Sequence, residues 1–185
     1  MSWADDSHAI ARREVCNALL VPGSAWMSAY LSGMGSMRPS EVRSRILRDH
    51  EALSERLTAL QRFADEAVES NGEACARTRE FACGVVEELA DHLDVEEQLL
   101  VPMLRDMDAW GPLRADELRQ HHDQQWRGLK RLRDRVSSPL QPPELAAHIA
   151  LMVQLLQHEL AQEAHELLTP EILRDDVLGI DVEDG

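Results

Sequence analysis

Residues 87–104 read EELADHLDVEEQLLVPML, and the centre of this stretch pairs a histidine with a glutamate four residues later. On an α-helix His92 and Glu96 lie one turn apart on the same face. A buried carboxylate is costly unless a cation compensates it, and histidine with glutamate is a ligand pair for iron, manganese or zinc. The stretch therefore predicts a helix that presents metal ligands to a hydrophobic interior, and a complete site requires matching groups from other helices. The apolar residues that place this face near the interior are Leu89, Leu93, Leu99, Leu100 and Met103.

Four long amphipathic stretches account for most of the chain. In each of them apolar residues recur at three- and four-residue steps, the spacing of one helix face. Pro39 favours a helix start, Asn71-Gly72 is a stop signal, and we expect Pro102 and residues 110–112 to end the second helix. Sustained alternation typical of strands is missing, so the sequence predicts an all-α, up-down-up-down four-helix bundle with an N-terminal helical extension. The expected helices cover residues 39–70, 73 to beyond 100, 113–136 and 144–168.

The predicted organisation has three parts. Residues 1–38 form an extension that packs on the bundle, with a helix expected over residues 3–20 and a lid over a site as the alternative interpretation. Residues 39–170 form the bundle itself. Residues 171–185 form a short C-terminal helix, around residues 172–178, and an acidic tail. The sequence leaves open whether the extension covers the site or joins two copies in a homodimer.

Charge and composition exclude several classes of function. The formal net charge of −15 would repel nucleic acid and anionic membranes. No apolar run approaches the length that spans a bilayer, and the acidic start lacks the features of a secretory signal. The three cysteines are widely spaced and form no CxxC motif. This pattern is typical of reduced thiols and not of disulfides or a zinc site. These features predict a cytoplasmic protein with a small-molecule partner, no nucleic acid and no membrane.

Each predicted helix carries a histidine near its middle. His50 and His122 lie on the apolar stripes of the first and third helices, and His158 follows two leucines, Leu151 and Leu155, on one face of the fourth. Mid-helix positions share one layer in an up-down bundle, so four imidazoles and two glutamates are expected to converge on the axis. This set fits a two-metal centre, for which iron is the leading candidate and manganese or zinc are alternatives. The candidate ligands are His50, His92, Glu96, His122, His158 and Glu163; His121, about 100° from His122, is expected on the flank.

Two other metal-binding patterns are absent from the sequence. Ferritin-like di-iron bundles use Glu-x-x-His on two helices, and no glutamate stands three residues before any histidine here. Helical zinc proteases use HExxH, and neither His50-Glu51 nor His158-Glu159 is followed by the second histidine.

Four pieces of the sequence resemble the hemerythrin-like HHE cation-binding family: RDHEAL at His50, HLDVEEQLLVP at His92, QHHDQQWRGL at His122 and HELAQE at His158. The similarity covers about residues 40–170, and the five-residue step from His158 to Glu163 matches that of the last-helix ligands in hemerythrins. The resemblance implies a four-helix bundle with two non-haem iron ions, joined by two carboxylates and an oxo or hydroxo group. Carried over residue by residue, it assigns His50 and His92 to one iron, His122 and His158 to the other, and Glu96 and Glu163 to the bridges.

The third helix departs from the pattern of the oxygen-carrying members. Those members have a second histidine four residues after the first, and here that place is Trp126, or Gln125 counted from His121. One ion would then keep an open position, which suits activation of oxygen or peroxide better than reversible carriage.

Several acidic residues near the predicted ligands have more than one interpretation. On the fourth helix the bridging role goes to Glu163, with Gln162 and Glu159 as alternatives. Glu97 and Glu51 are expected either in solvent or as partners of the outer histidine N–H groups, as is Glu159.

The sequence thus predicts a di-iron protein that reacts with dioxygen or hydrogen peroxide, through peroxide breakdown or oxidation of a small substrate. The alternatives are a non-enzymatic module that binds or senses oxygen, nitric oxide or iron, and a metal-free helical scaffold with hydrogen-bonded core histidines.

Overall fold

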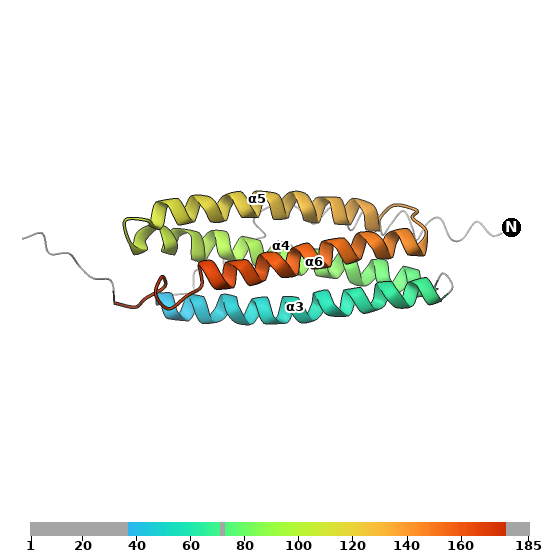
Figure 1. The fold of residues 1–185 in the computed structure, drawn as a ribbon, viewed down its shortest axis with the longest axis horizontal. Coiled ribbons are helices and arrows are strands. Elements are labelled where there is room, and N and C mark those ends of the chain that lie inside the picture. The colour runs from blue at the N-terminus through green and yellow to red at the C-terminus, as the bar shows by residue number, and fades with distance from the viewer. Residues whose placement is uncertain (1–36, 71–72, 177–185) are drawn as a thin grey trace, which may run out of the picture.

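A computed structural model describes residues 37–70 and 73–176 of the 185-residue chain. The described residues form four helices, α3 (Pro39–Glu69), α4 (Glu73–Met107), α5 (Gly111–Val136) and α6 (Pro142–Glu166), and they contain no strand (Figure 1). The predicted all-α bundle is therefore confirmed. The expected helix over residues 3–20 and nearly all of the N-terminal extension lie outside the described residues.

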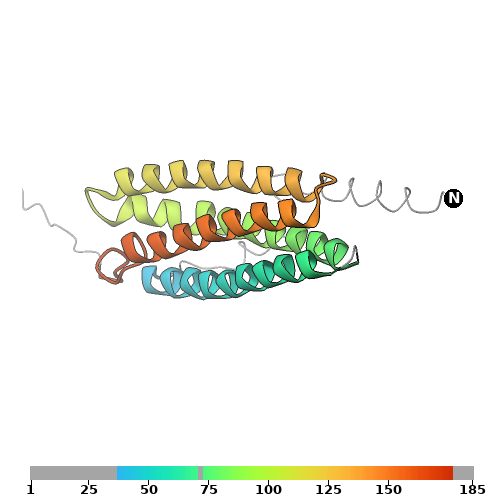
Figure 2. The same cartoon turned by 45° about the vertical axis from the view of Figure 1, so that its right-hand side comes forward.

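The four helices run alternately up and down and lie side by side in two views (Figures 1 and 2). Helix α3 packs against α4 and α6, and α5 packs against the same two helices, so each helix has two neighbours around the bundle axis. This arrangement brings the middles of all four helices to the same height. None of the described helices is both long enough and apolar enough to cross a bilayer.

Prolines and glutamates fix the starts of α3 and α6. Pro39 occupies the first helical position of α3, and Glu41 accepts a hydrogen bond of 2.9 Å from the backbone N–H of Arg38. Helix α6 repeats this arrangement, because Glu144 accepts from the backbone N–H of Gln141. Such capping satisfies N–H groups that have no partner within the helix. Helix α6 consequently begins two residues before the expected start at residue 144.

Helix α4 continues through Pro102 to Met107, so the expectation that Pro102 helps to end it is wrong. Proline inside a helix removes one hydrogen bond and costs about 3 kcal/mol. Pro102 lies on the exposed side of α4, while Val101, Leu104 and Met107 on the other sides are buried. Burial of each such side chain contributes roughly 1.5–3 kcal/mol, which exceeds the cost of the proline.

A tight turn follows α4. A side chain at Gly111 would place its Cβ 2.6 Å from the carbonyl oxygen of Arg105, so only glycine fits where α5 begins.

A polar layer divides the core into two apolar clusters. One cluster, toward the α3–α4 connection, includes Leu53, Leu89, Leu129 and Leu160. The other, toward the α4–α5 connection, includes Ile46, Leu100, Leu118 and Leu167. Buried polar side chains lie between these clusters on all four helices: His50, His92, Glu96, His122, Gln125 and Glu163.

The segment after α6 returns to the start of α3. Residues 170–172 form a turn, Leu173 is buried in the second cluster, and Asp175 accepts hydrogen bonds from the backbone N–H and the hydroxyl of Ser40. We expected a short helix around residues 172–178; the described part, up to residue 176, forms this turn and no helix, and the acidic tail lies outside the described residues.

Candidate metal centre

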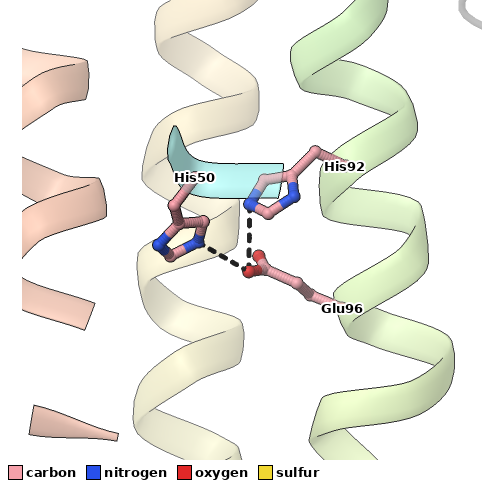
Figure 3. A group of neighbouring side chains, drawn as sticks. All are labelled: His50, His92 and Glu96. Carbon is pink, nitrogen blue, oxygen red and sulfur yellow. Dashed lines mark hydrogen bonds and ion pairs between the residues drawn. The ribbon is translucent and has the colours of Figure 1, made fainter. Parts of the chain in front are cut away.

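The first half of the site is formed by α3 and α4. His50 Nε2 lies 3.2 Å from Glu96 Oε1, and His92 Nε2 lies 3.0 Å from the same oxygen. The two imidazole rings meet edge to face, with centroids 4.9 Å apart. Figure 3 shows both rings pointing toward the Glu96 carboxylate, which is fully buried. His92 and Glu96 thus lie one turn apart on the buried face of α4, as their spacing in the sequence predicted.

The second half lies across the bundle, where α5 and α6 contribute. His122 Nε2 lies 3.1 Å from Glu96 Oε2, and Glu163 Oε2 lies 4.0 Å from His50 Nε2. Ligand-type atoms of Glu96, His122 and Glu163 all lie within 4.8 Å of one another, as do those of His50, His92 and Glu96. Glu96 thus belongs to both groups, which is the position of a ligand shared by two cations.

The residues fit a metal because several of their inward atoms lack a hydrogen-bond partner in the protein. Glu96 Oε2 and His122 Nε2 are buried and close together, yet they are not aligned as a hydrogen bond, and the same holds for His92 Nε2. Glu163 Oε1 is also buried without a partner. Burying an unpaired polar atom costs about 1–3 kcal/mol. Several such atoms around one point are expected where a cation completes the bonding.

The electrostatics of the polar layer separate the two carboxylates. Burial alone would raise the pKa of Glu96, but its contacts with the three imidazoles, that of His122 first, hold the pKa well below its usual range. Burial raises the pKa of Glu163 well above its usual value, and the neighbouring Glu96 carboxylate raises it further. One carboxylate is therefore compensated by imidazoles and the other is not, so a cation between them would stabilise both in the charged form.

Glu97 orients His122 from outside the layer. Its Oε1 lies 2.7 Å from His122 Nδ1, and Arg119 approaches its other oxygen at 3.6 Å. Burial would lower the pKa of His122, but the carboxylates of Glu96 and Glu97 raise it above its ordinary value. A carboxylate on the outer nitrogen fixes the ring and leaves the inner nitrogen for a metal. Glu97 thus has the outer-partner position that was one of its two interpretations, whereas Glu51 is exposed.

The structure does not bring His158 into the layer. We expected it to face the core because Leu151 and Leu155 precede it on one face, and this expectation is wrong. His158 is exposed, and the two leucines are 56% and 45% exposed. A different stripe of α6 faces inward: Leu145, Ile149, Val153, Leu156, Leu160 and Glu163.

Gln125 is a buried residue of the site. The sequence singled it out only as one of two residues, with Trp126, that could stand where oxygen-carrying members have a second histidine. It lies one turn after His122, and its side chain hydrogen-bonds Glu159 on α6. Burial raises the pKa of Glu159, and this hydrogen bond and two nearby histidines partly offset the effect. Trp126, the other occupant, is half-buried against the first apolar cluster.

A small cavity lies beside the site. Its volume is about 10 Å³, and it is lined by Leu89, His92, Leu93, Gln125, Leu129, Leu156 and Leu160. That volume corresponds to about one water-sized probe.

His121 is exposed, as we expected for the flank of α5, and His165 on α6 is exposed as well.

Comparison with known families agrees with this geometry. The family model described as the hemerythrin HHE cation binding domain matches residues 42–169. This range includes every buried residue of the polar layer. Comparisons with curated proteins and with solved structures found no match.

Proposed function

The chain belongs to the hemerythrin HHE cation-binding family, and from this premise we propose that its bundle holds two iron ions and reacts with dioxygen or hydrogen peroxide. The observation that carries the proposal is the group of buried ligand-type atoms on His92, Glu96, His122 and Glu163, which lie close together without aligned hydrogen bonds. In a metal-free scaffold these atoms would lower the stability of the fold, because buried polar groups without hydrogen-bond partners are destabilising.

The chain offers a distinct set of ligands to each ion. His50 and His92, from α3 and α4, would hold the first ion, and His122 on α5 would hold the second. Glu96 lies between the two groups and would bridge the ions, with Glu163 as the second bridge. When bound, iron supplies redox chemistry toward oxygen species that imidazole and carboxylate side chains do not have.

The protein's own contribution is to exclude water and to fix the ligands. Apolar clusters lie above and below the polar layer, so bulk water is kept away from it. Glu97 holds the His122 ring from its outer nitrogen. The cavity beside His92 has room for a molecule about the size of water, which favours a small reactant over a bulky organic substrate.

Iron stoichiometry tests the proposal. The full-length chain would be loaded with ferrous iron without oxygen, desalted and analysed for iron. We expect about two ions per chain and near-ultraviolet absorption after oxidation. His122→Ala should lose iron, while His121→Ala, an exposed neighbour on the same helix, should keep it. A wild-type chain that binds no iron would make the bundle a metal-free scaffold.

A second measurement separates an enzyme from a binding module. Rapid oxygen release after addition of peroxide, abolished in His92→Ala, would establish turnover. A reversible oxygen-dependent spectrum without turnover would instead support the alternative of a module that binds or senses its ligand.

A further inference from the structure

We propose that Glu159, and not His158, is the α6 side chain that completes the second metal subsite, which makes that subsite rich in oxygen ligands. This inference rests on the proposed function, because it assigns one more ligand to the same centre. It concerns the half of the site formed by α5 and α6, where the geometry above supplies His122 and shared carboxylates but no further ligand.

Helix geometry separates the two candidates on α6. At about 100° per residue, a four-residue step places Glu159 about 40° from Glu163, and a five-residue step places His158 about 140° away. Helix α6 is a continuous α-helix from Pro142 to Glu166, so no extra residue in a turn corrects this offset. His158 is accordingly exposed, while Glu159 is half-buried. Only Glu159 can share the face of Glu163.

Contacts with the neighbouring helix place the Glu159 carboxylate at the right height. It hydrogen-bonds Gln125, a side chain that is only 7% exposed and lies one turn from His122 on α5. Gln125 also lines the small cavity together with His92. Helices α5 and α6 are antiparallel (Figure 1). The step from His122 forward to Gln125 and the step from Glu163 back to Glu159 therefore lead toward the same end of the bundle. Glu159 therefore lies on the same side of the polar layer as Gln125, which lines the cavity beside His92.

The buried atoms of the layer supply an independent reason for a cation here. Glu163 Oε1 has no hydrogen-bond partner, and His122 Nε2 approaches Glu96 Oε2 at 3.1 Å without forming an aligned hydrogen bond; both side chains are at most 5% exposed. A cation bound to them would attract the Glu159 carboxylate by a change of rotamer, and the Gln125 amide would then be released toward the cavity. In this structure the Gln125 amide donates to the Glu159 carboxylate.

The assignment makes the two subsites chemically different. The first has two imidazoles, His50 and His92, whereas the second has one imidazole, His122, with Glu159 and the shared carboxylates. Imidazole suits iron and zinc, and carboxylate suits manganese and magnesium. The second subsite is therefore expected to accept manganese(II) more readily than the first.

Two neighbouring substitutions test the assignment. Glu159→Gln and His158→Gln would each be loaded with ferrous iron and, separately, with manganese(II), and the bound metal would be counted after desalting. In Glu159→Gln we expect one ion to bind as in wild type and the other to bind at least tenfold more weakly. His158→Gln should retain both. Helical content by circular dichroism verifies that each variant is folded.

A third variant, Glu159→His, gives a readout that a purely structural role would not produce. Histidine at residue 159 should restore binding of the second ion and shift the competition between iron and manganese(II) toward iron, because it replaces an oxygen ligand with a nitrogen.

The outcomes distinguish this assignment from the proposed function. If wild type holds two ions and Glu159→Gln keeps both at unchanged affinity, or if His158→Gln loses one, Glu159 is not the ligand while the metal centre stands. If wild type holds no metal, the proposed function fails first.

Discussion

Replacing Glu163 with glutamine should separate the stability of the fold from the function of the site. Glu163 is 5% exposed, its Oε1 has no hydrogen-bond partner, and another buried carboxylate, Glu96, lies beside it. Without metal this arrangement is unfavourable, because burial and like charge both oppose ionisation. Glu163→Gln keeps the shape, removes the charge and adds an N–H group that can donate to Glu96. We therefore expect the metal-free variant to be more stable than wild type.

The expected gain in the free energy of unfolding follows from the unfavourable burial that the substitution relieves. Giving one unsatisfied buried polar group a hydrogen-bond partner is worth about 1–3 kcal/mol, and 1 kcal/mol shifts the Tm of a domain of this size by about 2–4 °C. The metal-free Tm should therefore rise by about 2–12 °C at neutral pH. With metal present the order should reverse. Each ion at a hundredfold excess over its Kd stabilises wild type by about 2.7 kcal/mol, and the variant, with one ligand fewer, should gain less.

The contribution of Glu163 to stability depends on pH. Because the pKa of Glu163 is raised in the folded state, that state binds a proton more readily than the unfolded chain. Wild-type stability from this group therefore falls as pH rises from the ordinary value of 4.5 through the raised folded-state pKa. Glu163→Gln cannot lose this proton, so its advantage should be small in acid and grow with pH.

Thermal unfolding followed by circular dichroism, with and without ferrous iron and across pH, measures the metal-free Tm, the gain in Tm on metal binding and the pH dependence of the difference between variant and wild type. Glu117→Gln, an exposed glutamate on α5, is the matched control and should change neither Tm nor the response to metal. A lower metal-free Tm in Glu163→Gln, or an equal gain with and without metal, would refute the view that Glu163 is held in the core for a cation.

Three further substitutions test the parts of the fold that support the site. Glu97→Gln weakens the contact at 2.7 Å that orients His122; iron affinity, measured against a competing chelator, should fall about 10–100-fold while the stoichiometry is retained. Arg79→Met removes the guanidinium that donates to the carbonyl oxygen of Val136, at the end of α5, and to those of Ser138 and Leu140 in the α5–α6 connection; urea unfolding should show a loss of about 1–3 kcal/mol. Gly111→Ala forces a Cβ against the carbonyl oxygens of Leu104 and Arg105 and should destabilise the protein by about 1–3 kcal/mol. Gly84→Ala is its control: the nearest atom to the new Cβ is a side-chain nitrogen at 3.9 Å, and the helix interior should gain about 0.5–1 kcal/mol.

Much of the fold and half of the site follow from patterns along single helices. On α3 and α5 a single apolar stripe runs past His50 and His122, so the side that faces the core is determined by the sequence alone. On α4 the step of four residues fixes His92 and Glu96 on one face whatever the rest of the bundle does. For these three helices the sequence alone predicted the buried face, and their four candidate ligands are buried in the polar layer as predicted.

Tertiary packing decided what the local pattern left ambiguous. Pro102 is a helix breaker by its own chemistry, and only the burial of neighbouring side chains in the second apolar cluster keeps α4 continuous. Glu97 follows Glu96 in sequence and has the same side chain. Its contact with His122 depends on where α5 lies, so the sequence could only leave it as one of two interpretations.

On helix α6 the positions of the apolar residues led to the wrong prediction that His158 faces the core. Apolar residues occur on two sides of this helix, and Leu151 and Leu155 define a stripe that includes His158 but turns out to be exposed. The spacing already contained the contradiction. Glu163 and His158, five residues apart, cannot both face one point from a regular α-helix, because the offset is about 140°; both could ligate only if a turn held an extra residue, as in a π-bulge. Since α6 is regular throughout, one of the two had to face outward. The structure shows which of the two faces outward. The His158 imidazole is exposed, where solvent can hydrate it, while Glu163 is buried beside His50, His122 and Glu96.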